Sequence, residues 1–432
     1  MSHNFISSHK RDFSEIHKPK VSIKTFGCRL NQAETADIAA SFVNNNYEVV
    51  PFGEPADICI IHSCAVTAKA ESEALRLVRK IKEDLPCCKV IIAGCVSEVV
   101  PISRLYQFGA DIVVGQKDKY KIPSLISASQ NSTPSKIIPF FETTRALLKI
   151  QDGCNFFCTY CIVPYARGAS YSLPFHEIIE KAHQLADLGF KEIVITGANI
   201  GTYNYNRKNL IHLLEAVESI NGIERIRLSS LEISTVEYPL FYFMASSKKL
   251  CRYLHIPMQS GDDEILKAMN RRYSSIDYRA AIEKFLECVP NAGLGTDIII
   301  GFPGETEEAF TATLKLVGVV PFSNLHVFPF SPRQLTRAAK LNNPVPSRIV
   351  KDRTQKLLEL GKQKYKNFAE KFIGKTLKIL IEKTTSENCE GWSEEYIYVI
   401  SKKGNIPVNS IVEVIPVKYE NESLRADFKE FA

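Results

Sequence analysis

The segment Cys154-Asn-Phe-Phe-Cys158-Thr-Tyr-Cys161 carries three thiols within eight residues. A strand-like run at 145–150 and the turn-forming pair Asp152-Gly153 precede it. Three thiolates can hold three irons of a cubane cluster, and because no fourth cysteine follows closely, one iron would stay open for a small ligand. The alternative is structural zinc, which needs a second cysteine pair or paired histidines at defined spacing. The downstream sequence offers no such partner, so the pattern favours an iron–sulfur site.

The spacing Cys-x3-Cys-x2-Cys of this segment resembles that of the radical S-adenosylmethionine (SAM) superfamily. The resemblance implies that the amino and carboxylate groups of SAM chelate the open iron. It also implies that the reduced cluster splits SAM to give a 5'-deoxyadenosyl radical, so that the cofactor supplies the difficult chemistry and the protein orients it.

Length and composition limit the possible classes of protein. A chain of 432 residues predicts two to three domains, each with its own core. The net charge of +6 permits nucleic acid as a partner without requiring it. There is no apolar run of transmembrane length and no apolar signal segment, so we expect a cytoplasmic protein without membrane contact. Twelve cysteines in such a chain favour metal sites and buried thiols over disulfides.

The first predicted domain, residues 20–130, alternates short β-branched runs with amphipathic helices, which is typical of a parallel α/β sheet. Three of its expected strands are each followed by a cysteine, namely Cys28, Cys64 and Cys95. Because the carboxyl ends of parallel strands share one edge, these thiols should converge. We therefore predict a second three-thiolate cluster with an open iron. The alternative is three separately buried cysteines.

A Ser- and Pro-bearing stretch at 129–135 leads to the second predicted domain, residues 140–370. Six strand candidates there each end in a polar or glycine-rich tip, which predicts a partial (βα)6 TIM-like barrel with its site at the carboxyl ends of the strands. Glycines would let the backbone approach a ligand, and polar tips could bind it, although each alone could equally be a turn or cap. The predicted cofactor-binding residues are Gly197, Asn199, Glu232, Gln259, Gly301 and Gly304, with His255 and Arg333 as further candidates for binding cofactor or substrate.

The C-terminal part begins with an expected basic helix at about 346–372, which is either a solvated face or a phosphate-binding surface. Residues 373–432 alternate strand-like runs with Gly and Asn turns and predict a small OB-like β-barrel. Its aromatic residues Trp392, Tyr396 and Tyr398 either stack on RNA bases or belong to the core. Trp392 and Arg333 are the predicted substrate-binding residues.

Five segments resemble the radical SAM methylthiotransferases, whose terminal barrel is called a TRAM domain. They are 25–32 (Thr-Phe-Gly-Cys-Arg-Leu-Asn-Gln), 63–67 (Ser-Cys-Ala-Val-Thr), 94–95 (Gly-Cys), 151–168 around the first thiol motif, and 255–261 (His-Ile-Pro-Met-Gln-Ser-Gly). The resemblance extends from Val21 to the end of the chain. Within the family the motifs are most like the MtaB class, which adds a methylthio group to carbon 2 of N6-threonylcarbamoyladenosine at adenosine-37 of tRNA.

The resemblance implies two [4Fe-4S] clusters, one held by Cys28, Cys64 and Cys95 and the other by Cys154, Cys158 and Cys161. It implies that SAM is used twice, as methyl donor and as radical source, and that the partners are tRNA, a sulfur donor and an electron donor such as flavodoxin or ferredoxin. No catalytic residue is predicted beyond the cluster ligands.

Two departures from the family pattern concern His62-Ser63, where Asn-Thr is usual, and 334–336, where a glycine is usual. The departure at His62-Ser63 affects the surroundings of the predicted cluster at Cys28, Cys64 and Cys95. The departure at 334–336 affects local substrate contacts. Two other functions stay open: methylthiolation of another tRNA adenosine derivative or of a ribosomal-protein side chain, and RNA binding by a non-enzymatic iron–sulfur or zinc protein.

Overall fold

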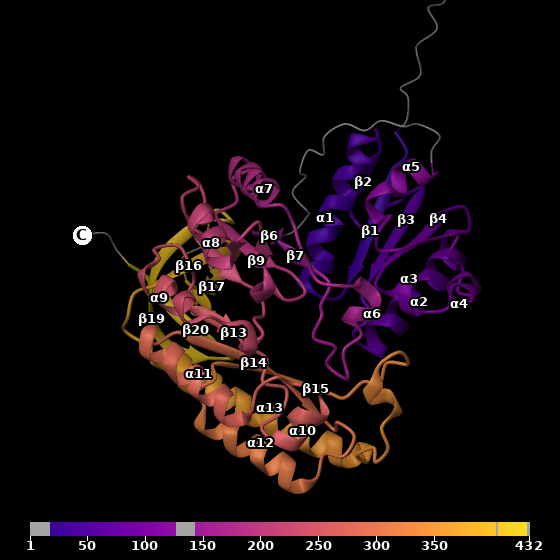
Figure 1. Ribbon diagram of the computed structural model, residues 1–432. Helices are drawn as coiled ribbons and strands as arrows, with labels where there is room; N and C mark the ends of the chain where they lie inside the picture. Colours follow the sequence, from indigo (N-terminus) through magenta and orange to yellow (C-terminus); the bar gives the residue numbers. More distant parts are fainter. Residues whose placement is uncertain (1–17, 127–142, 403–404, 430–432) are drawn as a thin grey trace, which may run out of the picture.

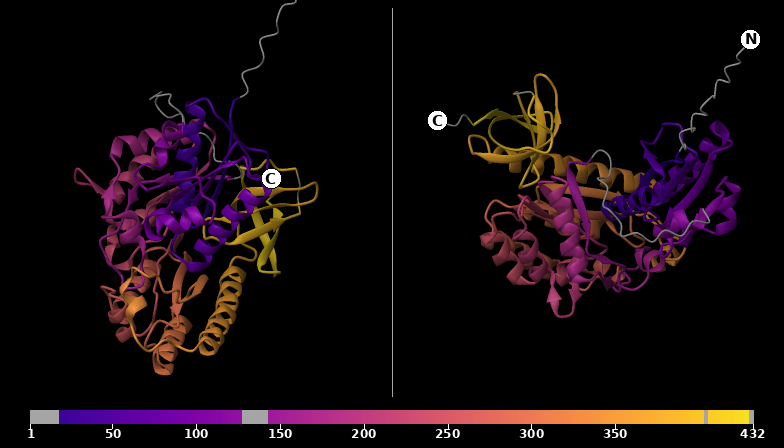
Figure 2. Two further views of the ribbon diagram at one scale, coloured as in Figure 1. Left: turned by 90° about the vertical axis from the view of Figure 1, so that its right-hand side faces the viewer. Right: turned by 90° about the horizontal axis from the view of Figure 1, so that it is seen from above.

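The computed structural model describes residues 18–126, 143–402 and 405–429. The stretch 129–135, and the predicted domain ends at 130 and 140, lie outside the described residues. Three units follow one another along the chain: an N-terminal sheet with its helices, a central barrel, and a small terminal barrel (Figure 1). Seen from above, the N-terminal unit and the terminal barrel both flank the central barrel (Figure 2).

The N-terminal sheet has five parallel strands in the order β2-β1-β3-β4-β5, which confirms the predicted parallel α/β architecture. The short strand β2 was not predicted. Every residue of the central strand β3 is buried, as expected of a parallel strand covered on both faces. The elements are β1 Lys20–Phe26, α1 Arg29–Asn44, β2 Glu48–Val50, β3 Ile58–Ser63, α2 Ala68–Asp84, β4 Lys89–Gly94, α3 Val96–Val99, α4 Ile102–Gln107, β5 Ile112–Val114, η1 Lys119–Lys121 and α5 Ile122–Ile126.

The core of this unit should be sensitive to the loss of apolar volume. Ile60 lies in the middle of β3 and is fully buried. We expect Ile60→Ala to lower the free energy of unfolding by about 2–5 kcal/mol, because it removes buried methyl groups and leaves a cavity. The matched change Ile102→Ala affects a side chain that is 56% exposed in the same unit and should cost well under about 1 kcal/mol. Urea denaturation measures both; equal losses would contradict the packing described here.

The central barrel has six parallel strands in two three-stranded sheets, β12-β9-β6 and β13-β14-β15, and a parallel bridge between Ile226 and Leu250 joins them. This confirms the predicted partial barrel. The strands are β6 Arg145–Lys149, β9 Glu192–Thr196, β12 Arg225–Leu228, β13 Tyr253–His255, β14 Gly293–Ile300 and β15 Asn324–Pro329. The helices are α6 Val163–Arg167, α7 Phe175–Asp187, α8 Leu210–Glu218, α9 Tyr238–Ser246, α10 Asp263–Ala268, α11 Ser275–Cys288 and α12 Glu307–Val319; short pieces are β7 Gln151–Asp152, β8 Tyr171–Ser172, β10 Asn204–Tyr205, β11 Lys208–Asn209, η2 Ile200–Thr202, η3 Ile233–Thr235 and η4 Arg337–Lys340.

The long helix α13, Ser347–Glu370, packs against β15 and leads into the terminal barrel. Its basic residues do not all face solvent. Arg353 is buried and pairs with Glu305 at 2.6 Å and with Glu307 at 2.9 Å. This arginine therefore anchors the helix to the loop after β14, whereas Lys351 is exposed and remains available for solvent or phosphate.

The terminal unit is a closed barrel with strand order β16-β17-β18-β20-β19, as the sequence predicted. Its strands are β16 Leu377–Thr384, β17 Cys389–Ser393, β18 Tyr398–Ser401, β19 Ile411–Glu420 and β20 Ser423–Phe428. Two buried arginines of β12 attach it to the central barrel. Arg225 donates to the carbonyl of Trp392 and Arg227 to that of Ser393, both at 3.0 Å. Among the described residues, none of the helices is long and apolar enough to cross a membrane.

Candidate functional site

The structure brings Cys28, Cys64 and Cys95 together at the carboxyl edge of the N-terminal sheet. Each follows directly on β1, β3 or β4, and the Cys64 thiol lies within hydrogen-bonding reach of both other thiols. Gly27 makes this approach possible. It adopts a φ of +113°, and a Cβ there would lie 2.2 Å from the Cβ of Cys64. The predicted convergence of the three thiols is therefore present.

The surroundings of this thiol triad favour thiolates. Hydrogen bonding to Cys64 and the charge of Arg167 outweigh burial and lower the pKa of Cys28 to about 6. The side-chain amide of Gln116 donates to the Cys95 sulfur at 3.1 Å. Hydrogen bonding to both neighbours and burial instead raise the pKa of Cys64. Three converging soft sulfur donors fit three corners of an iron–sulfur cubane.

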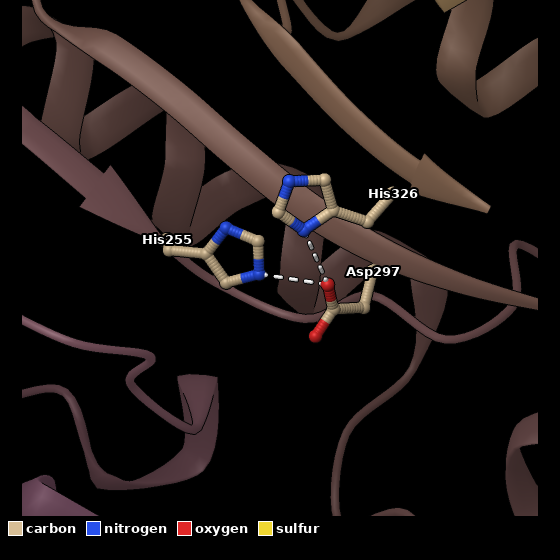
Figure 3. A group of neighbouring side chains, drawn as sticks. All are labelled: His255, Asp297 and His326. Carbon is tan, nitrogen blue, oxygen red and sulfur yellow. Dashed lines mark hydrogen bonds and ion pairs between the residues drawn. The ribbon is translucent and has the colours of Figure 1, made fainter. Parts of the chain in front are cut away.

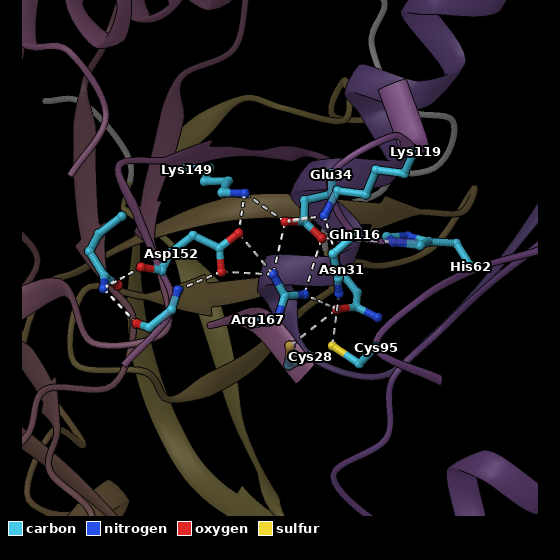
Figure 4. Close-up of polar contacts among 12 residues, drawn as sticks. Cys28, Asn31, Glu34, His62, Cys95, Gln116, Lys119, Lys149, Asp152 and Arg167 are labelled. Atoms are coloured by element: carbon cyan, nitrogen blue, oxygen red, sulfur yellow. Dashed lines mark hydrogen bonds and ion pairs between the residues drawn. The ribbon is translucent and has the colours of Figure 1, made fainter. Parts of the chain in front are cut away.

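A buried charge network lies directly behind this triad (Figure 4). Glu34 of α1 is fully buried and pairs with Lys119 at 2.8 Å, Lys149 at 2.6 Å and Arg167 at 2.9 Å. Asp152 accepts from Lys149 at 2.6 Å and from Arg167 at 2.9 Å. Three cations thus face two carboxylates, and the network joins α1 of the N-terminal unit to β6, β7 and α6 of the central barrel. Its surplus positive charge suits the negative charge of a thiolate-ligated cluster.

His62, one of the two departures from the family pattern, is neutral in this environment. It is fully buried, its Nδ1 lies 2.8 Å from the hydroxyl of Thr35, and burial lowers the pKa of the imidazole to about 3. His62 therefore adds no charge beside the first triad. Its role is to fill space and to make a hydrogen bond.

The second triad, Cys154, Cys158 and Cys161, lies in the loop between β7 and α6. Arg271 donates to the Cys158 sulfur at 3.3 Å and forms an ion pair with Glu232. Burial and the neighbouring Cys158 raise the pKa of Cys161 to about 12. A thiol in such a place ionises when a metal binds, so three clustered sulfurs beside a cation again fit a cluster with one open iron.

A cavity of about 470 Å³ lies beside the first triad, between the N-terminal unit and the central barrel. The thiols of Cys28, Cys64 and Cys95 form part of one wall. Residues that follow Cys161 and the tips of β9 and β12 also line the cavity. Arg29, Leu30 and Val66 of the N-terminal unit line it too. The rest of the lining comes from the strands β13–β15 and from the terminal barrel, and comprises Tyr253, His255, Asp297, His326, Phe328 and Tyr396.

The six predicted cofactor-binding residues fall into four places. Gly197 lines the cavity, and Glu232 lies by the second triad through Arg271. Asn199 and Gln259 are buried at the ends of their strands, and the Oδ1 atom of Asn199 has no hydrogen-bond partner, as expected where a ligand completes the site.

Gly301 and Gly304 lie elsewhere. A side chain at Gly301 would meet Val350 of α13 at 2.5 Å, and the Gly304 amide donates to the carbonyl of Asn343 at 2.9 Å. Neither glycine is among the residues that line the cavity. The structure thus gives both glycines a packing role against α13 and the loop before it, and cofactor binding by them stays a prediction.

The two predicted substrate-binding residues are also outside the cavity lining. Arg333 is buried and forms an ion pair with Glu71 of α2, so it joins the central barrel to the N-terminal unit. Trp392 stacks on Tyr396 with ring centroids 4.5 Å apart, and Tyr396 stacks on Tyr253 at 4.7 Å. Of the terminal unit's aromatic residues that the structure describes, Tyr396 is the one that lines the cavity, and Trp392 stacks on it.

Sequence reasoning missed Asp297 and His326, which meet His255 on the cavity lining (Figure 3). The Asp297 carboxylate accepts from His255 at 2.9 Å and from His326 at 3.1 Å. One ligand atom from each residue lies within 4.8 Å of the others, a spacing that a divalent cation could also use. The available signal was an ionisable residue beside apolar strand residues: Asp297 directly before Ile298, and His326 between Leu325 and Val327.

Comparison with known proteins follows the same division of the chain. Residues 148–317 match the Radical SAM superfamily model, and residues 20–115 match that of Uncharacterized protein family UPF0004. The chain is 36% identical over 406 residues to "Threonylcarbamoyladenosine tRNA methylthiotransferase MtaB" of Chlamydia pneumoniae, covering 92% of this chain and 95% of that protein. The chain belongs to the radical SAM methylthiotransferase family. Family membership makes it an enzyme and implies SAM and a [4Fe-4S] cluster as cofactors.

Other relatives of this methylthiotransferase fall into two groups. The MtaB protein of Aquifex aeolicus is 34% identical, over 92% of this chain and 100% of its own length. A "tRNA-2-methylthio-N(6)-dimethylallyladenosine synthase" of Acetivibrio thermocellus is 32% identical, over 93% and 87% respectively. Among solved structures, the radical SAM methyltransferase TsrM of Kitasatospora setae matches with a TM-score of 0.54 at 13% identity, over 72% of this chain and 75% of that one, which shows the shared fold alone.

Proposed function

We propose that this enzyme adds a methylthio group to carbon 2 of N6-threonylcarbamoyladenosine at position 37 of tRNA. The observation that carries the proposal is a cavity whose lining includes the Cys28, Cys64 and Cys95 thiols, the residues that follow Cys161 and the tips of β9 and β12. A transfer that needs both a sulfur source and a radical source requires them around one space. The names of the relatives in Chlamydia pneumoniae and Aquifex aeolicus support the nucleoside.

In this proposal each thiol triad holds one [4Fe-4S] cluster through its three cysteines. When bound, the cluster at Cys154, Cys158 and Cys161 would supply radical chemistry with SAM, and the cluster at the other triad would supply the sulfur. Arg271 donates to the Cys158 sulfur and so holds the loop that carries the second triad, while Glu232 fixes the guanidinium of Arg271. The charge network behind Cys95 compensates charge at the first triad, Cys28, Cys64 and Cys95. A flavodoxin- or ferredoxin-type electron donor and a sulfur donor are the proposed further partners.

The cavity suits a nucleoside that has left its stack. Its volume of about 470 Å³ lies within the usual range for small-ligand sites. Enzymes that act on a base generally extract it from the stack, and single-stranded loops make this inexpensive. Phe328 lines the cavity, is 44% exposed and offers an aromatic surface against which an extruded base can stack.

The test uses the full chain, reconstituted anaerobically with iron and sulfide and incubated with SAM and a reductant. It is offered tRNA carrying either N6-threonylcarbamoyladenosine or N6-dimethylallyladenosine, and the nucleosides are analysed by mass spectrometry. We expect 2-methylthio-N6-threonylcarbamoyladenosine to be the main product. Modification of the dimethylallyl substrate alone, or SAM cleavage without any modified nucleoside, would refute the proposed substrate.

A further inference from the structure

Three adjacent strands place His255, Asp297 and His326 side by side. Asp297 of β14 pairs in register with His326 of β15, while His255 of β13 pairs with Gly295, two residues before Asp297. A Cβ on Gly295 would lie 2.0 Å from the hydroxyl of Tyr253 and 2.6 Å from Nδ1 of His255. Glycine at this position therefore lets both side chains lie over the sheet, so that His255 reaches Asp297.

The bonds to Asp297 fix which ring nitrogens carry protons. Although burial opposes ionisation, the hydrogen bonds from His255 and His326 hold the pKa of Asp297 well below its usual range. An ionised carboxylate can only accept hydrogen bonds. His255 must therefore donate from Nε2 and His326 from Nδ1, and the two rings are stacked with centroids 5.1 Å apart.

The two histidines differ in what their remaining nitrogens can contact. The His255 side chain is 9% exposed, and its Nδ1 lies 3.5 Å from the Tyr253 hydroxyl. The His326 side chain is 47% exposed, lines the cavity, and carries Nε2 on the side of the ring away from Asp297 (Figure 3). His326 is thus held by a carboxylate at one nitrogen and presents the other to the cavity. An imidazole in this position can donate to an anion from Nε2 when both of its ring nitrogens carry a proton.

The charges on the cavity lining also favour an anionic ligand. The charged side chains there are Arg29, Arg167 and Asp297, and Arg167 is already paired with Glu34 and Asp152. Arg29 donates to the Tyr396 hydroxyl at 2.9 Å, a neutral partner that leaves its charge uncompensated. Asp297 is in turn shared by two histidines. Arg29 is therefore a cation on the lining that forms no ion pair with a carboxylate of the described residues.

From this geometry we infer that His326, oriented by Asp297, binds the carboxylate of the threonyl group on the substrate adenosine and thereby selects it over an apolar N6 substituent. This inference rests on the proposed function and deepens it. A dimethylallyl group has no polar atom to offer, so it would bury the His326 nitrogen without a partner. Sites built around such a hydrogen bond discriminate strongly against analogues that lack it. His326 would contact the substrate, whereas Asp297 and His255 are positioning residues.

The experiment compares the reconstituted wild-type enzyme with His326→Leu, His326→Gln and a control, His183→Leu, which alters an exposed histidine of α7 outside the cavity lining. The substrates are tRNA with N6-threonylcarbamoyladenosine, the same tRNA with the threonyl carboxylate converted to its methyl ester, and tRNA with N6-dimethylallyladenosine. The readouts are kcat and KM for nucleoside formation, 5'-deoxyadenosine release, and the iron and zinc content.

We expect His326→Leu to lower kcat/KM for the natural substrate about 10- to 100-fold, the loss expected for one charged hydrogen bond. The loss should lie mainly in KM, with iron content and 5'-deoxyadenosine release unchanged. Turnover of the methyl ester should already be low and should not fall further, and His326→Gln should restore part of the activity because it keeps a donor. His183→Leu should behave like the wild type.

Two results would overturn the inference. The first is an equal loss on the acid and the ester, which would show that the carboxylate is not what His326 contacts. The second is stoichiometric zinc in the wild type that disappears in His326→Leu, which would make the three residues a metal site. Failure of the proposed function is distinguishable from both, because wild-type enzyme would then leave the threonylcarbamoyl substrate unmodified.

Discussion

The Cys28→Ala variant is expected to form no methylthio nucleoside while it still cleaves SAM. Cys28 belongs to the triad that lines the cavity and is separate from Cys154, Cys158 and Cys161, where SAM is proposed to bind. Two remaining thiols do not hold a cubane cluster securely, so the sulfur source is lost and the radical source is retained. Mass spectrometry of the nucleosides and quantification of 5'-deoxyadenosine measure the two activities separately, and the iron content should fall by about half.

The matched variants sharpen this result. Cys158→Ala should abolish both SAM cleavage and methylthiolation, because both depend on the radical. Cys87→Ala alters an exposed cysteine outside both triads and should leave iron content and activity unchanged. Loss of SAM cleavage in Cys28→Ala would contradict the division of labour between the triads. Full methylthiolation in that variant would contradict the role of the first triad altogether.

The Glu34→Gln variant should lose about 3–5 kcal/mol of unfolding free energy, the usual cost of removing one partner from a buried ion network. Glu34 is fully buried and compensates Lys119, Lys149 and Arg167, and Asp152 alone cannot balance three cations. The control Glu283→Gln breaks an exposed pair with Arg279, which lies at 2.7 Å, and should cost no more than about 1 kcal/mol. Chemical denaturation measures the free energy of unfolding of both variants. Similar losses in the two would contradict a stabilising role of the buried network.

The same network predicts a pH dependence of stability. Although burial opposes ionisation, the charges of Arg167, Lys149 and Lys119 hold the pKa of Glu34 well below its usual range. A carboxyl whose pKa is depressed by folding stabilises the protein above its unfolded pKa of about 4.3, and that contribution is lost as the pH falls further. The wild type should therefore lose stability below about pH 4 more steeply than Glu34→Gln, as acid denaturation followed by circular dichroism would show.

The placement of the thiols could be predicted because it depends on a simple property of parallel sheets. Cys28, Cys64 and Cys95 each follow directly on a strand of the N-terminal sheet. Their convergence can be predicted without knowing the strand order, because the carboxyl ends of all strands in a parallel sheet lie on one edge. The strands β17 and β20 were missed because short strands rich in Ser, Glu, Asp and Arg lack the β-branched enrichment that marks a strand.

Contacts between units could not be predicted, since they depend on how three separate cores dock. Arg333 appears in a motif after the last barrel strand, yet its partner is Glu71, far away in the first unit. Glu34 lies in a helix of modest amphipathicity, and its cations come from three different segments. The contact between Asp297 and His326 depends on the register of β14 and β15. Strands of a buried parallel sheet are apolar on both faces, so the sequence pattern does not specify that register.

The contact between Arg29 and Tyr396 has a consequence for biosynthesis. Arg29 begins the first helix of the protein, Tyr396 belongs to its last unit, and both line the same cavity. A ribosome must therefore translate 367 residues beyond Arg29 before this wall can close. A nascent chain has both cysteine groups early, but the cavity is completed only when the terminal barrel, β16 to β20, has emerged and docked.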